Sequence, residues 1–207
     1  MYLTRMELDT SKRKTIMALV SPSLFHGAIE TAFTERGRKL WRIDKLADKT
    51  YLLLVSDEMP DFESAMKQFG AKSGCKSLDY TPFIENIYKG DRRQFRLTAN
   101  PVITKSAGTG NRGKVFAHLT PAQQEQWLMD RTIQNGFSLL PDDYRVVQSD
   151  WVSFCKGSGC QVSFRKVTFE GVLTVTDEDL FKSAMINGIG REKAYGCGML
   201  TVSRKIV

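Results

Sequence analysis

The sequence has few histidines and cysteines, the side chains that most often bind zinc. Its 207 residues include only two histidines, His26 and His118, and four cysteines that form no CxxC pair. A structural zinc site needs about four Cys, His or carboxylate ligands at recurring spacings. We therefore expect neither a metal site nor a metal cofactor.

The sequence also lacks long apolar runs and nucleotide-cofactor motifs. No stretch is long enough to span a bilayer, and residues 1–7 alternate like a strand instead of forming the apolar core of a signal peptide. The glycine-rich segment 188–198 lacks the Gly-Lys-Ser/Thr ending of a P-loop and precedes the last predicted strand, unlike a dinucleotide fingerprint. These absences predict a cytoplasmic protein with free thiols, no membrane contact and no small-molecule cofactor.

Positive charge is abundant and clustered. The formal net charge is +7, and residues 89–114 contain seven Lys or Arg against one acid, Asp91. A second cluster holds Arg36, Arg38, Lys39 and Arg42. Because Lys and Arg release counterions from a phosphate backbone, this distribution favours a nucleic-acid partner over ordinary solubilising charge.

The first ninety residues predict one ferredoxin-like unit. Strands are expected at 2–8, 40–46, 51–55 and 83–88, with 70–79 as a loop. An amphipathic helix is expected from Phe25 to about Gly37, started by Ser21 and Pro22, and a second helix at 61–69 capped by Asp61. This order is βαββαβ, the ferredoxin-like pattern.

The rest of the chain repeats that order less cleanly. Strands are expected at 94–104, 145–155, 161–175 and 199–205, and helices at 121–135 and 177–187. Residues 106–111 have the composition of a mobile loop, and 156–159 that of a hairpin turn. We predict an α+β fold of two tandem ferredoxin-like domains, residues 1–90 and 91–207.

His26 is the leading catalytic candidate. It lies in the first turn of the predicted helix, one residue from Phe25, so a 100° step turns its ring off the buried face. A neutral imidazole beside a basic surface suits proton transfer on RNA, whose 2′-hydroxyl is a built-in nucleophile that needs no metal. The alternative is an incidental surface histidine. His118, before a helix start, favours a structural role.

Two further segments could contact a phosphate backbone. Lys156, Arg165 and Lys166 flank the predicted hairpin turn, where a lysine could stabilise developing phosphate charge, although a solvated hairpin is equally compatible. The segment 188–198 has four glycines with Arg191 and Lys193, and its backbone could approach phosphate or simply pack a helix on a strand.

Taken together, these segments resemble the CRISPR-associated CasE family of precursor-RNA endoribonucleases in type I-E Cascade complexes. The resemblance is carried by residues 1–4 (MYLT), 95–101 (FRLTANP), 126–128 (QWL), 169–173 (FEGVL), 188–190 (GIG), 193–194 (KA) and 196–198 (GCG), in family order. It implies a metal-independent cut at the 3′ side of a CRISPR repeat hairpin, leaving a 2′,3′-cyclic phosphate, by a protein that then stays bound as a Cascade subunit.

The resemblance also assigns residues. His26 falls at the family's catalytic histidine. Some relatives carry a Tyr three residues earlier, where this chain has Ser23. Relatives use a lysine before the FEG strand, which leaves Lys156, Arg165 and Lys166 open.

The expected site therefore has four catalytic candidates and ten RNA-binding candidates. The catalytic candidates are His26, Ser23, Lys156 and Lys166. The RNA-binding candidates are Arg36, Arg38, Arg92, Arg93, Arg96, Arg112, Lys114, Arg165, Arg191 and Lys193. Two alternatives are a non-catalytic subunit that binds hairpin RNA, suggested by Ser23, and a generic binder of single strands. The second would require aromatic residues along a central strand, where only Phe95 qualifies.

Overall fold

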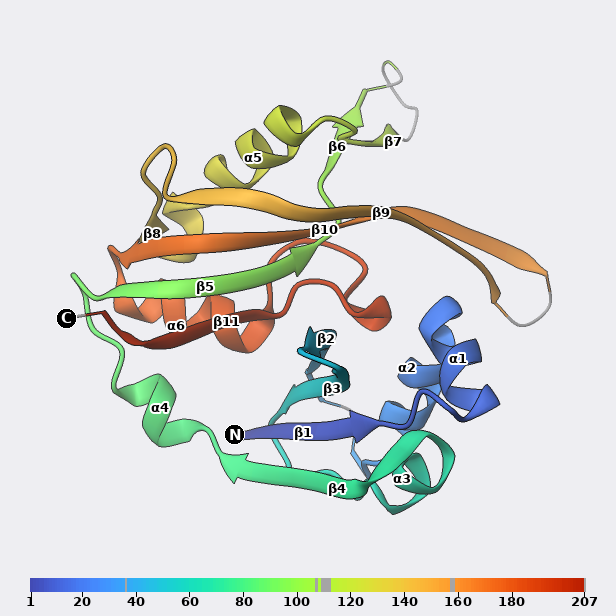
Figure 1. The fold of residues 1–207 in the computed structure, drawn as a ribbon. Coiled ribbons are helices and arrows are strands. Elements are labelled where there is room, and N and C mark those ends of the chain that lie inside the picture. Colours follow the sequence, from blue (N-terminus) through green and yellow to red (C-terminus); the bar gives the residue numbers. More distant parts are fainter. Residues whose placement is uncertain (36, 107, 109–112, 157–158, 207) are drawn as a thin grey trace.

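The computed structural model describes residues 1–35, 37–106, 108, 113–156 and 159–206. Figure 1 shows two sheet-and-helix units joined by helix α4 (Thr81–Glu85). The first sheet ends at Asp79 and the second begins at Arg92. The division into domains 1–90 and 91–207 stays a prediction that agrees with this arrangement.

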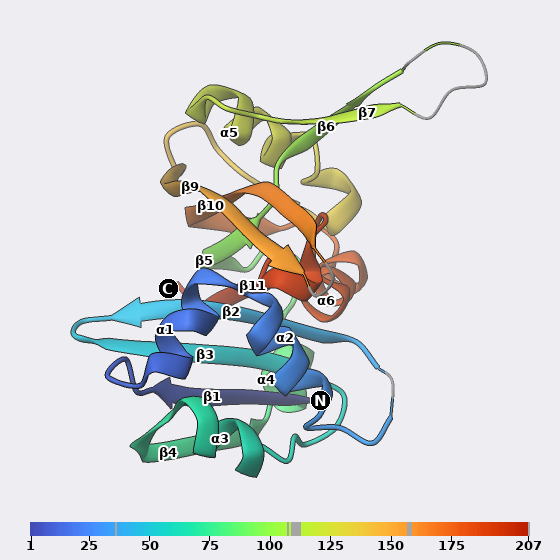
Figure 2. The same cartoon turned by 90° about the vertical axis from the view of Figure 1, so that its right-hand side faces the viewer.

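The first unit is a four-stranded antiparallel sheet in the order β2-β3-β1-β4. Its strands are β1 (Tyr2–Leu8), β2 (Lys39–Leu46), β3 (Lys49–Ser56) and β4 (Gly70–Asp79), and its helices are α1 (Arg13–Val20), α2 (Ser23–Glu30) and α3 (Glu63–Phe69). This is the ferredoxin-like order, with two helices in the first crossover. In Figure 2 the three helices lie together on one face of the sheet.

The second unit has the sheet order β11-β5-β10-β8, with β9 also paired to β10. Its elements are β5 (Arg92–Ala99), α5 (Pro121–Met129), η1 (Ile133–Asn135), β8 (Phe137–Ser138), β9 (Tyr144–Lys156), β10 (Cys160–Val175), α6 (Glu178–Asn187), η2 (Lys193–Tyr195) and β11 (Leu200–Lys205). A separate hairpin, β6 (Val102–Lys105) with β7 (Lys114–Ala117), projects beyond α5 (Figures 1 and 2). The predicted α+β, tandem ferredoxin-like class is confirmed.

Three predictions in the first unit are wrong. Residues 13–20 form helix α1, where no helix was expected. Residues 70–79 form strand β4, because the backbone of β1 pairs with it although nearly all of its side chains are exposed or only partly buried. The predicted strand 83–88 is instead α4 and the turn after it, since Ile84 and Ile87 bury one face at helical spacing.

Most elements predicted in the second unit are close to those observed, but the short strands β7 and β8 were not predicted, and one strand and one helix each divide in two. The strand expected at 94–104 divides at Asn100-Pro101 into β5 and β6, because proline cannot donate to the ladder. The helix expected at 121–135 is α5 followed by η1, and its Thr120 cap is present. The loop at 106–111 and the turn at 156–159 lie partly outside the described residues.

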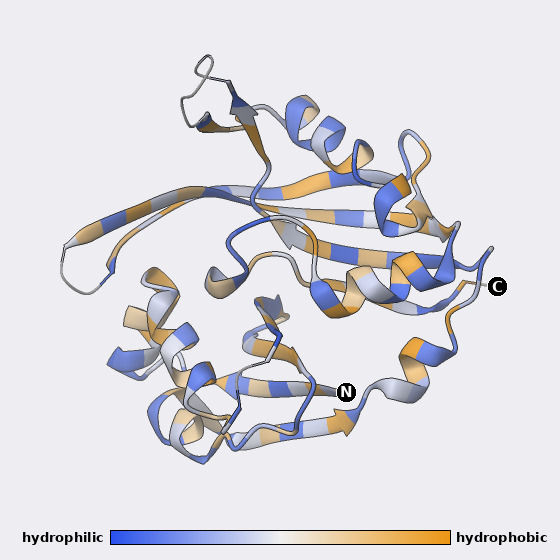
Figure 3. Cartoon of the chain, turned by 180° about the vertical axis from the view of Figure 1, so that it is seen from behind, coloured by the Kyte–Doolittle hydropathy of each residue, from blue (hydrophilic) through white to orange (hydrophobic). Residues whose placement is uncertain are grey.

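Two main hydrophobic cores hold these elements. One packs α1, α2 and α3 on the first sheet through residues such as Phe25, Ile29 and Phe69. The larger core fills the second unit and also takes in Leu40 and Val55 from the first, so the two units share buried surface. Hydrophilic and hydrophobic residues alternate along β9 and β10, as expected for strands with unlike faces (Figure 3).

Candidate active site and nucleic-acid interface

Helix α2 presents His26 at the edge of the first unit. Phe25 and Ile29 are each 1% exposed and anchor the helix in the core. The next residue in the helix is turned by about 100°, so the His26 side chain is 34% exposed. The helix ends at Glu30, well before the predicted end near Gly37. Burial of Phe25 and Ile29 therefore fixes the direction of the His26 side chain.

Two side chains lie beside the His26 ring. Glu30 lies one turn later, with Oε1 3.8 Å from His26 Nδ1 and Oε2 3.3 Å from Lys39 Nζ. The Tyr195 ring, from the second unit, meets the His26 ring edge to face, with centroids 6.4 Å apart and planes at 78°. The imidazole thus has a carboxylate of its own helix and an aromatic ring from the second unit beside it.

Tyr195 belongs to the site, although sequence reasoning missed it. It lies in η2, within the glycine-rich segment, and its ring packs on Phe154 at 5.0 Å and on Phe164 at 6.1 Å between centroids. With buried Cys197, these rings form a small separate cluster. A lone tyrosine among glycines was the available signal, but its meeting with His26 depends on the tertiary fold.

The glycine-rich segment approaches the first unit too closely for a side chain at Gly196. This residue has φ +80°, and an added Cβ would lie 3.1 Å from the Trp41 ring and 3.3 Å from Lys166 Nζ. Glycine adopts this left-handed backbone without a Cβ penalty. Two features, the left-handed backbone and the close contact with Trp41, therefore favour glycine here and let η2 reach α2.

Several predicted cations lie along this edge. Lys193, in η2 with Tyr195, donates a hydrogen bond to the Asn187 carbonyl at 2.7 Å. Burial first, and then the nearby Arg38 charge, lower the pKa of Lys193. Arg38 and Arg191 are exposed. The structure thus brings Arg38 and Lys193 to the unit boundary near His26, while Arg36 lies outside the described residues.

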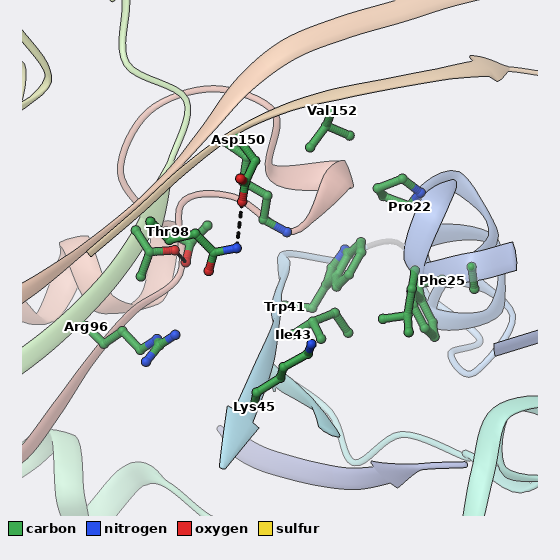
Figure 4. A pocket seen from close by; sticks show the side chains of 14 residues that line it. Pro22, Phe25, Trp41, Ile43, Lys45, Arg96, Thr98, Asp150 and Val152 are labelled. Carbon is green, nitrogen blue, oxygen red and sulfur yellow. Dashed lines mark hydrogen bonds between the residues drawn. The ribbon is translucent and has the colours of Figure 1, made fainter. Parts of the chain in front are cut away.

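Lys166 lies elsewhere, in a cavity of 360 Å³ between the two units. Pro22, Phe25 and Trp41 form one side of the cavity in Figure 4, with Thr98 and Asp150 opposite. His26 and Tyr195 do not line it. Burial lowers the pKa of Lys166. Because its Nζ would lie 3.3 Å from a Cβ at Gly196, Lys166 approaches the glycine-rich segment from the cavity.

Ser23 and Lys156 show no contact with the His26 ring. Ser23 begins α2, and its Oγ is 3.0 Å from the Oγ of Ser21. Ser21 was expected to cap the helix, but α2 has no side-chain cap. Lys156 is exposed at the end of β9, opposite Cys160, and the hairpin residues 157–158 after it lie outside the described residues.

Arg93 is a correction to the predicted interface. It is 4% exposed, pairs with Asp91 at 2.6 Å, and donates to the carbonyls of Asn86 and Ser203. A buried guanidinium needs a counter-charge and hydrogen-bond acceptors, and these three residues of the protein supply them. Arg93 therefore supports the fold and is not available to bind RNA.

The other predicted cations are dispersed. Arg92 is exposed near Asp143, and Lys114 is exposed on β7. Arg96 forms ion pairs with Asp44 and Glu170 beside the cavity. Arg165 lies over the Trp151 ring at 5.7 Å, and Arg112 is outside the described residues. These residues do not form a single patch with His26.

The described part of the chain has neither a membrane-spanning helix nor a metal-binding cluster. None of the helices there is long and apolar enough to cross a bilayer. Among the same residues, no three His, Cys, Asp or Glu side chains gather in a way that could hold a metal ion.

The fold and this edge define a class: a tandem ferredoxin-like protein with a histidine and cations where its two units meet. A family model described as CRISPR associated protein matches residues 1–204, so the chain belongs to this family.

Named relatives agree with this family. The chain is 28% identical to the CRISPR-associated endoribonuclease Cse3 of Thermus thermophilus, over 98% of this chain and 100% of that protein. It is 31% identical to the CRISPR system Cascade subunit CasE of Escherichia coli over 53% of this chain and 56% of that protein. A solved structure of CRISPR endoribonuclease Cse3 bound to a 19-nucleotide RNA has a TM-score of 0.84 and 26% identity, and the match covers 98% of this chain and 100% of that one.

Proposed function

We propose that this protein is an endoribonuclease that processes CRISPR precursor RNA at the repeat hairpin and then remains with the guide RNA in a Cascade complex. The observation that carries the proposal is the full-length similarity to a named endoribonuclease and to its RNA-bound structure. The Cascade role is supported by the named subunit of Escherichia coli. The partners are thus a repeat RNA hairpin and other Cascade subunits.

In the proposed reaction, the ribose 2′-oxygen attacks the adjacent phosphorus. The new O2′–P bond forms as the P–O5′ bond breaks, giving a 2′,3′-cyclic phosphate and a 5′-hydroxyl. One proton leaves O2′ and another must reach O5′, so the nucleophile is already in the substrate and the protein supplies only proton transfer and charge stabilisation. Such a reaction proceeds without a metal ion.

His26 is the proposed proton-transfer group. Its ring is partly exposed and lies beside Glu30 and Tyr195, which supports a fixed orientation toward a bound strand. Lys193 and Arg38 are the proposed phosphate contacts on the same edge. Lys193 is partly buried, and the loss of hydration that lowers its pKa also strengthens an ion pair with phosphate. Tyr195 is proposed to position His26.

The other predicted residues keep secondary roles in this proposal. Lys166 supports the glycine-rich segment from the cavity, while Lys156, Lys114 and Arg165 would contact the hairpin RNA farther from the cut. Arg92 and Arg191 are proposed as peripheral backbone contacts. Ser23 is not assigned a proton-transfer role, because its hydroxyl is engaged with Ser21.

One observation favours a second function, a non-catalytic subunit that binds hairpin RNA. Ser23 occupies the place where some relatives have a tyrosine, and its hydroxyl is paired locally. Incubation with a CRISPR repeat hairpin in EDTA separates the two functions. The endoribonuclease predicts a single cut in wild type that is lost in His26→Ala with hairpin affinity retained. Tight binding with no cut by wild type would establish the second function.

A further inference from the structure

Arg42 crosses from the first unit into the second. It lies on β2, the edge strand of the first sheet, and is 2% exposed. Its Nη1 donates to the carbonyls of Arg96 and Met199, both at 3.0 Å, and its Nη2 donates to Thr201 Oγ1 at 2.9 Å. All three acceptors belong to the second unit, so one side chain from the first unit is bonded to β5 and to the start of β11.

Asp44 neutralises and orients this guanidinium. Its two oxygens accept from Arg42 Nε and Nη2, each at 2.8 Å, and one of them lies 3.2 Å from Arg96 Nε. A planar guanidinium with a bidentate carboxylate partner has its direction fixed, which a lysine cannot reproduce. The remaining donors of Arg42 are therefore aimed at the second unit.

The acceptor at Met199 directly follows the glycine-rich segment. Trp41, the residue before Arg42, contacts Gly196 within that segment, and Tyr195 precedes Gly196. Two consecutive residues of β2 thus hold the segment at two points. Tyr195 lies in the part of the segment that these two residues hold, and there its ring meets the His26 ring of α2.

We propose that Arg42 is a positioning residue for RNA cleavage: its hydrogen bonds across the unit boundary fix the glycine-rich segment so that Tyr195 holds His26 in its working orientation. The catalytic part of this inference rests on the proposed endoribonuclease function. Arg42 itself is buried and does not contact substrate.

The chain offers a matched control. Arg93 is also a buried arginine, and it is bonded to Asp91 and to the backbone carbonyls of Asn86 and Ser203, none of which lies in the glycine-rich segment. Arg42→Lys and Arg93→Lys each keep the positive charge and lose the planar guanidinium that donates two parallel hydrogen bonds to a carboxylate. Both variants should lower thermal stability, which controls for simple destabilisation.

Single-turnover cleavage of a repeat hairpin separates the two arginines. Arg42→Lys should lower the cleavage rate about 10- to 100-fold, as a small misplacement of a catalytic group does. Its hairpin affinity, and the rate of Arg93→Lys, should stay within about twofold of wild type. A wild-type rate in Arg42→Lys, or equal rate losses in both variants, would overturn the proposal.

A double variant tests whether stability alone explains a loss. Arg42→Met leaves Asp44 buried without its main partner, whereas Arg42→Met with Asp44→Leu removes both charges and should recover stability. The double variant still lacks the bonds to Met199 and Thr201, so its cleavage rate should stay low. Recovery of rate together with stability would show that Arg42 acts only on stability.

Hydrogen exchange gives a readout that needs no activity. The amides of Tyr195 and Cys197 both donate to the Glu192 carbonyl, at 2.9 and 3.3 Å. In Arg42→Lys these amides should exchange faster than in wild type, and in Arg93→Lys they should not. If wild type fails to cut RNA, this comparison still decides whether Arg42 holds the segment. Unchanged exchange in Arg42→Lys would refute the inference by itself.

Discussion

The two histidines of this chain, one in each unit, have similar sequence contexts and different surroundings. Each lies at or just before a helix start, His26 in α2 and His118 before α5. The His26 ring is partly exposed, with Glu30 and Tyr195 beside it. His118 is held through its backbone, which donates to Pro101 and accepts from Gln124. Burial and then the Arg131 charge lower its pKa.

This difference shows what selects the candidate catalytic group. Nearness to a helix start is shared by both histidines and therefore does not discriminate between them. Among the described residues, the His26 ring has an aromatic ring from the other unit and a carboxylate of its own helix beside it, whereas His118 is near the Arg131 charge. The site is thus assembled by the packing of the two units.

The largest expected effect is on the cleavage rate, when each histidine is replaced by alanine in a separate variant. His26→Ala should lower the single-turnover cleavage rate about 10²- to 10⁴-fold, because it removes the proposed proton-transfer group. His118→Ala should change it by no more than about twofold. Hairpin affinity, measured by filter binding, should be retained in both. Similar rates in the two variants would remove the distinction between the histidines.

Replacing Tyr195 separates its ring from its hydroxyl. Tyr195→Ala leaves a hole between Phe154 and Phe164, so we expect a loss of about 3 kcal/mol in unfolding free energy together with slower cleavage. Tyr195→Phe keeps the packing and should retain most of both quantities. Denaturant unfolding and cleavage rates provide the test. A Phe variant as slow as the Ala variant would instead give the hydroxyl a direct role in the reaction.

Salt dependence should distinguish the cations beside His26 from those elsewhere. Removing Arg38 and Lys193 together should reduce the slope of log affinity against log salt by about one to two, since each phosphate contact contributes roughly one unit. Arg92→Ala should reduce it by at most about one. Titration of hairpin binding at several salt concentrations measures both. An unchanged slope in the double variant would place the RNA backbone away from this edge.

The smallest expected effect is on the pH dependence of the unfolding free energy, to which His118 contributes. Its pKa is lowered in the folded state, so the unfolded chain binds more protons as the pH falls through the usual histidine range. This contribution to stability is therefore present above the unfolded pKa and is lost as the pH decreases toward the folded one. His118→Gln should flatten the fall in unfolding free energy between about pH 7.5 and 5.5. An identical fall in wild type and variant would contradict this.

Much of the fold could be predicted because strands such as β3 and β10 have strong apolar patterns. Strand β4 could not, since it is an edge strand with mainly exposed polar side chains, and its pairing with β1 is what defines it. Helix α4 was misread because Ile84 and Ile87 lie in a short apolar segment that fits either periodicity. The local sequence pattern does not predict an element that forms only through tertiary pairing.

Part of the candidate site could also be named from the sequence. His26, Arg38 and Lys193 were identifiable from residue type and charge clustering. Tyr195 was not, because it reaches His26 only through a left-handed glycine turn packed on Trp41. Arg93 looked like an exposed cation in a basic run, but its alternation within β5 turns it toward buried Asp91. Side-chain direction and partners separate a binding arginine from a supporting one.

The most direct test uses a repeat hairpin in which a single ribose, on the 5′ side of the cut, lacks its 2′-hydroxyl. In EDTA, we expect wild type to cut the unmodified RNA to a 2′,3′-cyclic phosphate and to bind the deoxy RNA equally well without cutting it. Cleavage of the deoxy RNA, or a requirement for added metal with the unmodified RNA, would contradict proton transfer by His26 to and from the RNA's own hydroxyl groups.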